Sequence, residues 1–279
     1  MRMPVRKNNE DIVSGRSINV LFSGGYDSTL VLCDAVAESK TVNCITVEPS
    51  FSFGKVERER KARSNIINFL RRKYNTEINV SNIKIDISES HYTDGSYLTQ
   101  PLFWLPSIFV LTPRNKDAEI RLGYIAGDQT LYHIHDLETM AKAVSNFKDK
   151  DMELVFPLGY MSKEDVIVEL FENYREVINF CSTCVNMGEE VDYCCECESC
   201  KSVMRALKYI ASDDSRSLEL RKWAVRQLKK YRVNADILLD LKCDDIAVNK
   251  CRLALAGIAS SCKSPIKVKE YMGVIKDGE

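Results

Sequence analysis

The residues best suited to chemistry lie near the N-terminus, in the segment SGGYDS at residues 23–28. The segment follows the apolar run Val20–Phe22, which is typical of a buried strand, and a helical pattern begins at Ser28. Glycines let a backbone approach oxygen atoms closely, and the N–H groups of a helix's first turn point at such atoms. The hydroxyls of Ser23 and Ser28 add two donors. The segment therefore predicts an anion site, although the same residues could form an ordinary turn.

Asp27 is the unusual member of this segment. A carboxylate repels a neighbouring phosphate unless a cation lies between them, and Mg²⁺ is the obvious bridge. No Gly-Lys-Ser/Thr follows the glycines, so the segment is not a Walker A loop. The residue types thus favour a phosphate site that includes a divalent cation.

A second candidate site is a run of six cysteines within twenty residues: Cys181, Cys184, Cys194, Cys195, Cys197 and Cys200. Tetrahedral zinc takes four thiolates, and two-residue gaps let the cysteines of a turn face one ion. The spacing of Cys194, Cys197 and Cys200 predicts a structural Zn²⁺ site, with Cys181 or Cys184 as the fourth ligand. A redox role for a single Cys-x-x-Cys pair is the alternative.

The composition fits a globular protein of 279 residues, with 45% hydrophobic and 28% charged residues. The formal charge of −1 does not favour nucleic acid as a partner, although it leaves room for a local basic patch. No apolar run reaches membrane-spanning length, and residues 1–15 lack the apolar core of a signal peptide. We therefore expect a cytoplasmic protein without membrane contact, whose 11 cysteines are thiols or metal ligands.

Strand and helix patterns alternate along the first half of the chain. Predicted strands cover residues 20–22, 41–47, 82–87, 121–126 and 153–157. Predicted helices cover residues 28–39, 57–74, 136–147 and 163–174, with a loop at 88–100 and a buried helix within 102–111. This order predicts an α/β fold, a doubly wound parallel sheet with helices on both faces. Such sheets bind ligands at the carboxyl ends of their strands, where residues 23–28 would lie.

We expect three parts along the chain. Residues 1–178 form the α/β nucleotide-binding domain, and residues 179–211 form the cysteine-rich zinc module. Residues 212–279 form a helical extension, with helices at 218–231, 235–241 and 247–258. The extension either packs on the core or offers a surface to a partner.

The segment SGGYDS resembles the Ser-Gly-Gly-x-Asp-Ser signature of the PP-loop ATP pyrophosphatases. Enzymes of this class hold the pyrophosphate end of ATP and join AMP to a substrate oxygen. The resemblance implies that the loop holds the β- and γ-phosphates while Asp27 positions Mg²⁺. The implied ATP-binding residues are Ser23, Gly24, Gly25, Asp27, Ser28 and Val47.

The signature and the cysteine run together are similar to QueC, the 7-cyano-7-deazaguanine synthase family, over about residues 18–210. Thr183-Cys184 matches the family's first zinc cysteine, which implies the ligand set Cys184, Cys194, Cys197 and Cys200. Asp128 and His135 fall in the loop that approaches the purine-like substrate, and Lys163 begins a matching helix. From the residues alone, Asp128 could instead cap a turn, His135 could lie in a solvated loop, and Lys163 could be a surface lysine.

The chain departs from the QueC pattern at three places near the expected nucleotide and substrate pocket. Tyr26 stands where the family usually has Gln, and Cys195 stands where a glycine follows the first clustered cysteine. The family's Pro-Gly-Arg-Asn is replaced by Leu-Pro-Ser-Ile at residues 105–108. Because these differences lie near the expected pocket, they leave the identity of the substrate open.

The resemblance implies an ATP-dependent ligase. The carboxylate of 7-carboxy-7-deazaguanine attacks the α-phosphorus, pyrophosphate leaves, and a nitrogen nucleophile takes the acyl group to give an amide. A second adenylation and dehydration gives the nitrile of 7-cyano-7-deazaguanine. This chemistry depends on positioning and charge neutralisation, with Asp27, Ser28 and Lys163 as the expected catalytic residues.

Three alternatives remain at this stage. QueC-like proteins of antiphage systems pass the acyl group to an amine of a partner protein, and the altered pocket and added tail favour this reading. A PP-loop tRNA sulfur transferase would need a reactive cysteine near the loop and a basic surface. A zinc-binding scaffold without activity would leave Asp27 without a role. The sequence leaves open whether the chain forms a homodimer.

Overall fold

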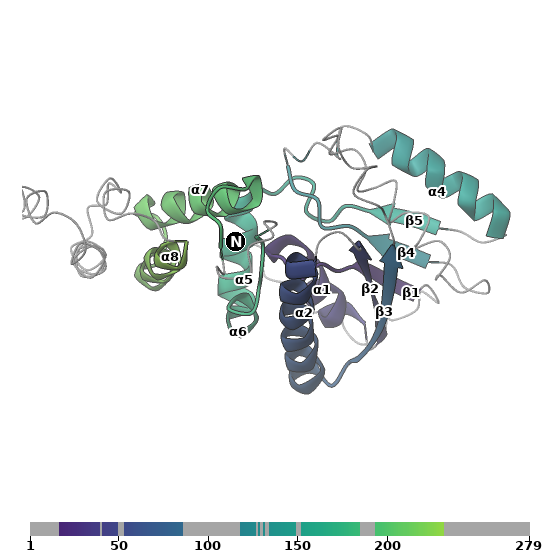
Figure 1. Ribbon diagram of the computed structural model, residues 1–279, viewed down its shortest axis with the longest axis horizontal. Helices are drawn as coiled ribbons and strands as arrows, with labels where there is room; N and C mark the ends of the chain where they lie inside the picture. The colour runs from purple at the N-terminus through teal and green to yellow at the C-terminus, as the bar shows by residue number, and fades with distance from the viewer. Residues whose placement is uncertain are drawn as a thin grey trace, which may run out of the picture. The chain divides into compact units, whose positions relative to one another are not determined.

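The computed structural model describes residues 17–39, 41–49, 53–85, 118–126, 128, 131, 134–148, 152–184 and 193–231 (Figure 1). The chain divides into two compact units, residues 1–182 and 183–279, and each is considered by itself. The predicted loop at 88–100, the predicted helices within 102–111, 235–241 and 247–258, and Gly127 lie outside the described residues. None of the described helices is long and apolar enough to cross a membrane.

The first unit is built on a five-stranded sheet with the order β3-β2-β1-β4-β5. The strands are β1 (Ser17–Leu21), β2 (Thr41–Pro49), β3 (Glu77–Ile85), β4 (Ala118–Arg121) and β5 (Met152–Val155). Every neighbouring pair is parallel. Since β2 and β3 extend from one side of β1 and β4 and β5 from the other, the predicted doubly wound α/β fold is confirmed.

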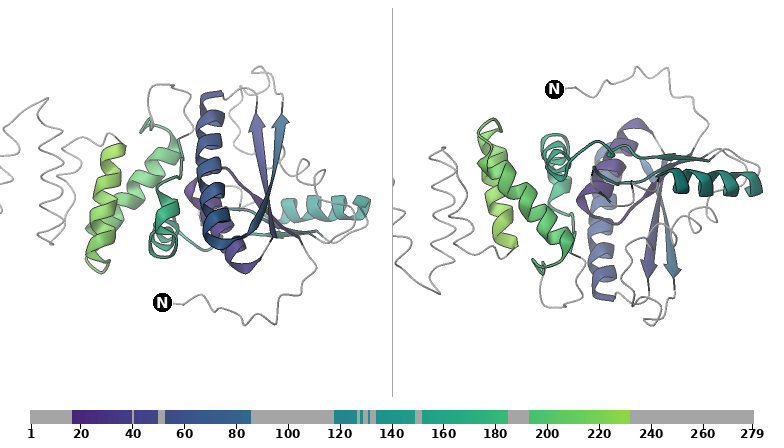
Figure 2. Two further views of the ribbon diagram at one scale, coloured as in Figure 1. Left: turned by 90° about the horizontal axis from the view of Figure 1, so that it is seen from below. Right: turned by 90° about the horizontal axis from the view of Figure 1, so that it is seen from above.

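Five described helices belong to this unit: α1 (Tyr26–Glu38), α2 (Phe53–Tyr74), α4 (Ile134–Lys148), α5 (Lys163–Asn173) and α6 (Arg175–Ile178). Figures 1 and 2 show α1 and α2 on one side of the sheet and α4 on the other. This arrangement follows from right-handed crossovers that run in opposite directions from β1.

Each side of the sheet has its own apolar core. Beneath α4, Leu137 and Ala141 pack with Ile45, Ile120 and Met152 of three strands. On the other side, α1 is buried almost all round, and its fully buried apolar side chains include Val31, Leu32, Cys33 and Ala35. Cys33 and Cys44 are fully buried, as expected for single cysteines in apolar surroundings.

Several element boundaries differ from those predicted. The helix predicted from residue 57 begins at Phe53, and the strand predicted from residue 82 begins at Glu77. The strand predicted at 121–126 is wrong in position, because β4 ends at Arg121. Beyond it, the N–H groups of Leu122 and Ala126 donate to the carbonyls of Val155 and Met161, each at 2.9 Å, so the backbone continues alongside the segment that follows β5.

Gly123, just beyond β4, brings this segment against the first turn of α1. A Cβ carbon at this position would lie 2.9 Å from the backbone N of Ser28 and 3.0 Å from the carbonyl carbon of Asp27. Such distances leave no room for any side chain. Gly123 therefore allows β4 and α1 to meet beside the glycines that follow β1.

The second unit contains α7 (Glu198–Ser212) and α8 (Leu218–Lys230). The buried residues of α7 recur with helical spacing, as in Val203, Leu207 and Ile210, and α8 contributes Trp223 and Leu228 to its own buried face. Ser217 caps α8 by accepting a hydrogen bond from the N–H of Leu220 at 3.3 Å. The helix predicted at 218–231 is thus confirmed.

One partly buried carboxylate, that of Asp34, joins α1 to the residue that ends α5. Asp34 Oδ1 accepts a hydrogen bond from the hydroxyl of Tyr174 at 2.9 Å. Burial raises the pKa of Asp34 to about 6, against the lowering effect of the Tyr174 bond; Glu169 and Glu38 add to the rise. The folded protein therefore binds a proton more tightly at this carboxylate than the unfolded chain does.

This shift predicts a pH-dependent effect of the variant Asp34→Asn. The wild-type free energy of unfolding falls as pH rises from about 4 to about 6, because the raised pKa makes ionisation of Asp34 unfavourable in the fold. Asn keeps an acceptor for Tyr174, so the variant should be about 1–2 kcal/mol more stable at pH 7.5 and no more stable at pH 4. Urea unfolding at both values measures this, with the exposed Glu138→Gln as control. An equal difference at both pH values would contradict the prediction.

A second prediction concerns Gly123→Ala. The added methyl group must displace the first turn of α1, so we expect a loss of about 1–3 kcal/mol in the free energy of unfolding. Gly159→Ala is the matched control, because its Cβ carbon would lie 3.4 Å from the nearest atom, the carbonyl oxygen of Phe156. Urea unfolding of both variants checks the pair. Equal stabilities would show that the fold accommodates a side chain at Gly123.

Candidate functional site

The segment SGGYDS covers the loop after β1 and the first turn of α1, at the carboxyl end of the central strand. Gly24 has φ +87°, a left-handed conformation that glycine adopts without strain. Gly25 is the N-cap residue of α1 and offers no side chain to the first-turn N–H groups. We call residues 23–25 the glycine loop. Its position and conformation are those of an anion site at a helix start.

Two serine hydroxyls lie across the glycine loop. The Oγ atoms of Ser23 and Ser28 are 3.0 Å apart. Ser28 Oγ accepts a hydrogen bond from the Ser23 N–H at 3.2 Å, and Ser23 Oγ accepts one from the Gly25 N–H at 3.3 Å. A phosphate oxygen that bound to the Gly25 N–H would therefore have to replace the Ser23 hydroxyl as its acceptor.

Asp27 forms an ion pair with Lys163, which begins α5. Lys163 Nζ contacts Asp27 Oδ2, and their side chains are only 13% and 23% exposed, so Lys163 is not a solvated surface lysine. A capping box fixes the start of α5: Ser162 Oγ accepts from the Asp165 N–H at 3.2 Å, and Asp165 Oδ2 accepts from the Ser162 N–H at 2.9 Å. The local sequence thus places a cation beside the glycine loop.

The other oxygen of the Asp27 carboxylate is buried and, among the residues that the structure describes, has no hydrogen-bond partner. A buried carboxylate oxygen normally has a donor or a cation nearby, and oxygen ligands are the ones that Mg²⁺ prefers. The donor set at Asp27 therefore fits a divalent cation, which is the group expected from the sequence.

Asp128 lies within the electrostatic reach of this ion pair. Its Oδ2 accepts a hydrogen bond from the Ile125 N–H at 2.8 Å, so the carboxylate does cap the turn that follows residue 125. Burial raises its pKa, the charge of Asp27 acts in the same direction, and Lys163 opposes both. The structure thus places three predicted site residues, Asp27, Lys163 and Asp128, in one charged environment.

Two predicted residues are less closely connected to this group. Val47 is half-buried in β2, in register with Ile83 of β3. His135 is exposed on the first turn of α4. Within the described chain, no hydrogen bond or ion pair joins His135 to the glycine loop or to Asp27.

Other residues around the glycine loop were not anticipated. The Ser182 N–H donates to the Gly24 carbonyl at 2.9 Å. Arg63 of α2 and Glu48 of β2 form a buried ion pair behind Gly24. Only Glu48 carried a sequence signal, as a charged residue at the end of an apolar strand.

Cys181 belongs to the first unit and is separate from the cysteine cluster. It is buried, its Sγ lies 3.9 Å from the Val177 carbonyl oxygen, and burial raises its pKa to about 12. Of the two cysteines left open by the spacing, Cys184 is the one that joins the cluster.

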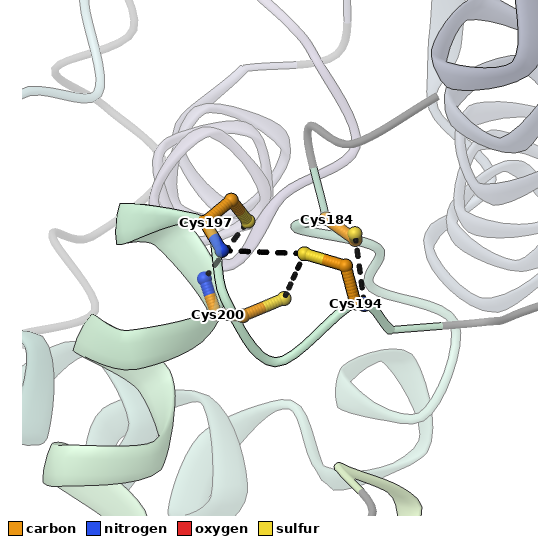
Figure 3. Close-up of side chains that lie close together, drawn as sticks. All are labelled: Cys184, Cys194, Cys197 and Cys200. Carbon is orange, nitrogen blue, oxygen red and sulfur yellow. Dashed lines mark hydrogen bonds between the residues drawn. The ribbon is translucent and has the colours of Figure 1, made fainter. Parts of the chain in front are cut away.

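The second unit brings four cysteines together, as Figure 3 shows for Cys184, Cys194, Cys197 and Cys200. Their sulfur atoms lie within 4.8 Å of one another, and those of Cys194 and Cys200 are 4.0 Å apart. Tetrahedral zinc with 2.3 Å bonds places its sulfur ligands about 3.8 Å apart. The cluster therefore fits a metal site.

Backbone N–H groups point at the sulfurs of this cluster. The N–H groups of Cys194 and Cys197 donate to the Sγ atoms of Cys184 and Cys194, each at 3.3 Å. The Cys200 N–H donates to Cys197 Sγ at 3.4 Å, where α7 begins. Such bonds favour the thiolate form that binds metal.

Cys195 has φ +64°, which is a left-handed conformation. The glycine expected here from the QueC pattern would adopt this conformation without strain. In this chain, Cys195 Sγ contacts the Tyr231 carbonyl, and the rings of Tyr193 and Tyr231 lie 4.2 Å apart. These contacts hold the turn at Cys195, with its left-handed backbone, against Tyr231 at the end of α8.

The sequence was compared with protein families and with curated proteins. The family model described as "Queuosine biosynthesis protein QueC" matches residues 119–211, about a third of the chain. The matched part includes Gly123, Asp128, Lys163 and the four clustered cysteines but not the glycine loop. The comparison with curated proteins gave no match. Over residues 119–211, which run from β4 into the last turn of α7, this chain is similar to the QueC family.

Proposed function

We propose that the chain is an ATP-dependent ligase that adenylates the carboxylate of 7-carboxy-7-deazaguanine and passes the acyl group to a nitrogen nucleophile. The QueC match supports the coarser description, an ATP-using enzyme related to the queuosine pathway. The observation that carries the finer proposal is the Asp27–Lys163 pair beside the glycine loop, because it offers both charges that a bound Mg²⁺–triphosphate requires.

Each residue of this group has a distinct proposed role. The Gly24 and Gly25 N–H groups and the hydroxyls of Ser23 and Ser28 bind the β- and γ-phosphates. Asp27 would hold Mg²⁺, which supplies neutralising charge when it is bound. Lys163 turns from Asp27 towards the phosphates and stabilises the charge that develops on pyrophosphate as it leaves.

The substrate is expected on the β4 side of the loop. Asp128, a partly buried carboxylate, is suited to accept hydrogen bonds from the amine groups of a deazaguanine. Val47 would contact the nucleotide from the end of β2. His135 would reach the substrate only from the exposed first turn of α4, and it is the least supported member of the set.

We assign Zn²⁺ to Cys184, Cys194, Cys197 and Cys200. With four protein ligands the ion has no open position, so its role is to hold the turn before α7 and not to act on substrate.

A second candidate function keeps the adenylation but transfers the acyl group to an amine of a partner protein. Helix α8 lies beyond the matched residues 119–211, so this chain has an ordered addition that could serve a partner. A tRNA sulfur transferase is less well supported. Cys33 and Cys181 are both buried with raised pKa values, and neither fits a reactive thiol.

The function is tested by incubating the protein with ATP, Mg²⁺ and 7-carboxy-7-deazaguanine. We expect AMP and pyrophosphate to form only when the acid is present, and Asp27→Asn to reduce AMP formation by about 100-fold or more. Chromatography measures AMP, and the exposed Glu138→Gln is the control. If AMP forms at the same rate without the acid, or if Asp27→Asn forms AMP at the wild-type rate, the proposed roles are refuted.

The acceptor of the acyl group is identified in the same reaction. With ammonium, a free amide or nitrile product is expected by mass spectrometry. If the acceptor is a protein, the mass gain instead appears on a co-expressed partner, and ammonium has no effect on product formation.

Metal content tests the zinc assignment. The purified protein should contain about one zinc per chain, and Cys197→Ser should lose it, because three ligands cannot close a structural site. Cys195→Ser is the matched control, since it removes a neighbouring thiol outside the ligand set and should keep the metal. Elemental analysis measures the zinc content of both variants and of the wild type. A folded wild-type protein without zinc would overturn the assignment.

A further inference from the structure

A buried pair of opposite charges lies behind the glycine loop. The side chains of Glu48, near the end of β2, and Arg63, in α2, are only 4% and 5% exposed, and Arg63 Nη2 donates to Glu48 Oε1 at 2.5 Å. Arg60 donates to the same carboxylate through Nε at 3.0 Å and Nη2 at 2.6 Å. The Glu48 carboxylate therefore accepts three charge-assisted hydrogen bonds, and these arginines hold its pKa below the ordinary value.

Stability alone does not account for this pair. Removing two charges from water is costly, and apolar side chains of similar size often stabilise a fold as well or better. What an ion pair adds is a fixed geometry, since the planar guanidinium meets the carboxylate in few arrangements. A second acceptor, Glu59 Oε2 at 3.3 Å from Arg63 Nη1, further restricts this guanidinium.

The stem of Arg63 touches the glycine loop. A Cβ carbon on Gly24 would lie 3.2 Å from Arg63 Cγ and 3.3 Å from the Arg63 backbone N. Ser182 binds the Gly24 carbonyl through its N–H at 2.9 Å. Gly24 is thus constrained both by α2 and by the backbone at Ser182.

We propose that Arg63, fixed by Glu48, is a positioning residue that supports Gly24 and so holds the Gly25 N–H and the first turn of α1 in the arrangement that binds phosphate. Arg63 acts through Gly24 and has no assigned contact with substrate. The inference depends on the proposed function for its ligand, but the support of the loop can be measured without that ligand.

The decisive variant is the double substitution Glu48→Gln with Arg63→Met. It removes both buried charges and keeps similar side-chain volumes; the charges that lose a partner, Arg60 and Glu59, are 47% and 16% exposed, so the fold should survive. We expect amide hydrogen exchange in a peptide covering residues 22–28 to become about tenfold faster, while exchange in α5 stays unchanged. Arg63→Lys keeps the charge and the stem but loses the planar guanidinium, so exchange in this peptide should be about threefold faster than in the wild type and slower than in the double variant.

The matched control removes a different ion pair of the same unit, through Arg121→Met with Glu38→Gln. Arg121 Nη2 lies 2.5 Å from Glu38 Oε2, and the Arg121 side chain is 11% exposed, but this pair ends on the last residue of α1, away from its first turn. In this control variant, amide hydrogen exchange in residues 22–28 should remain at the wild-type rate. The positioning role is wrong if the Glu48–Arg63 variant folds and its residues 22–28 exchange at the wild-type rate. It is also wrong if the control variant accelerates amide exchange in residues 22–28 by the same factor. Should the double variant not fold, Arg63→Lys decides alone, and its loop must exchange faster than wild type.

Binding of Mg²⁺–ATP gives the functional readout. Calorimetric titration should show a dissociation constant about tenfold higher in the Glu48–Arg63 variant than in the wild type and the control variant. If the wild-type protein does not bind Mg²⁺–ATP, the proposed function fails, whereas the exchange measurement still decides whether Arg63 positions the loop.

Discussion

The close approach of backbone to backbone around the glycine loop is the constraint on which the rest of the structure depends. Gly123 reaches the first turn of α1 where no side chain fits, and Gly24 lies against the backbone of Arg63. Ser182 completes the packing by binding the Gly24 carbonyl. Segments far apart in the sequence therefore meet within residues 24–28, and the sheet order β3-β2-β1-β4-β5 brings them to the same edge.

Much of the fold could be predicted because its helices and strands depend on patterns within short stretches of sequence. The apolar runs, the capping serine at 162 and the cysteine spacing each depend on neighbours in sequence. The start of β3 was missed because the alternation of Ile78 and Val80 with polar residues is interrupted at Ser81 and Asn82. In the structure, Asn79 donates to Asn43 and Asn43 to Asn19, each at 3.2 Å across three strands. This row of side-chain hydrogen bonds lies on the polar positions of the strands and supports a pairing that the sequence of one strand does not reveal.

The parts of the site that could not be predicted are those made by distant contacts. Gly123, Ser182 and Arg63 have no motif, and their importance arises only when β4, the end of the first unit and α2 converge on the loop. The spacing also could not choose between Cys181 and Cys184, since both belong to one Cys-x-x-Cys pair. Both are buried, and the choice depends on tertiary contacts: Cys184 lies with the other three sulfurs, whereas Cys181 Sγ lies 3.9 Å from the Val177 carbonyl oxygen.

The charges and hydroxyls at the glycine loop allow the loop backbone to keep one conformation with or without the phosphate that we propose it binds. The Gly25 N–H is bonded to the Ser23 hydroxyl, and one Asp27 oxygen is paired with Lys163, so most polar groups that the proposed function requires already have partners within the protein. Each of these partners is a side chain that can turn away by rotation, whereas the backbone is held by Gly123 and Ser182. A phosphate and its cation would then exchange one set of partners for another without moving the loop, which is the condition for preorganised electrostatic stabilisation.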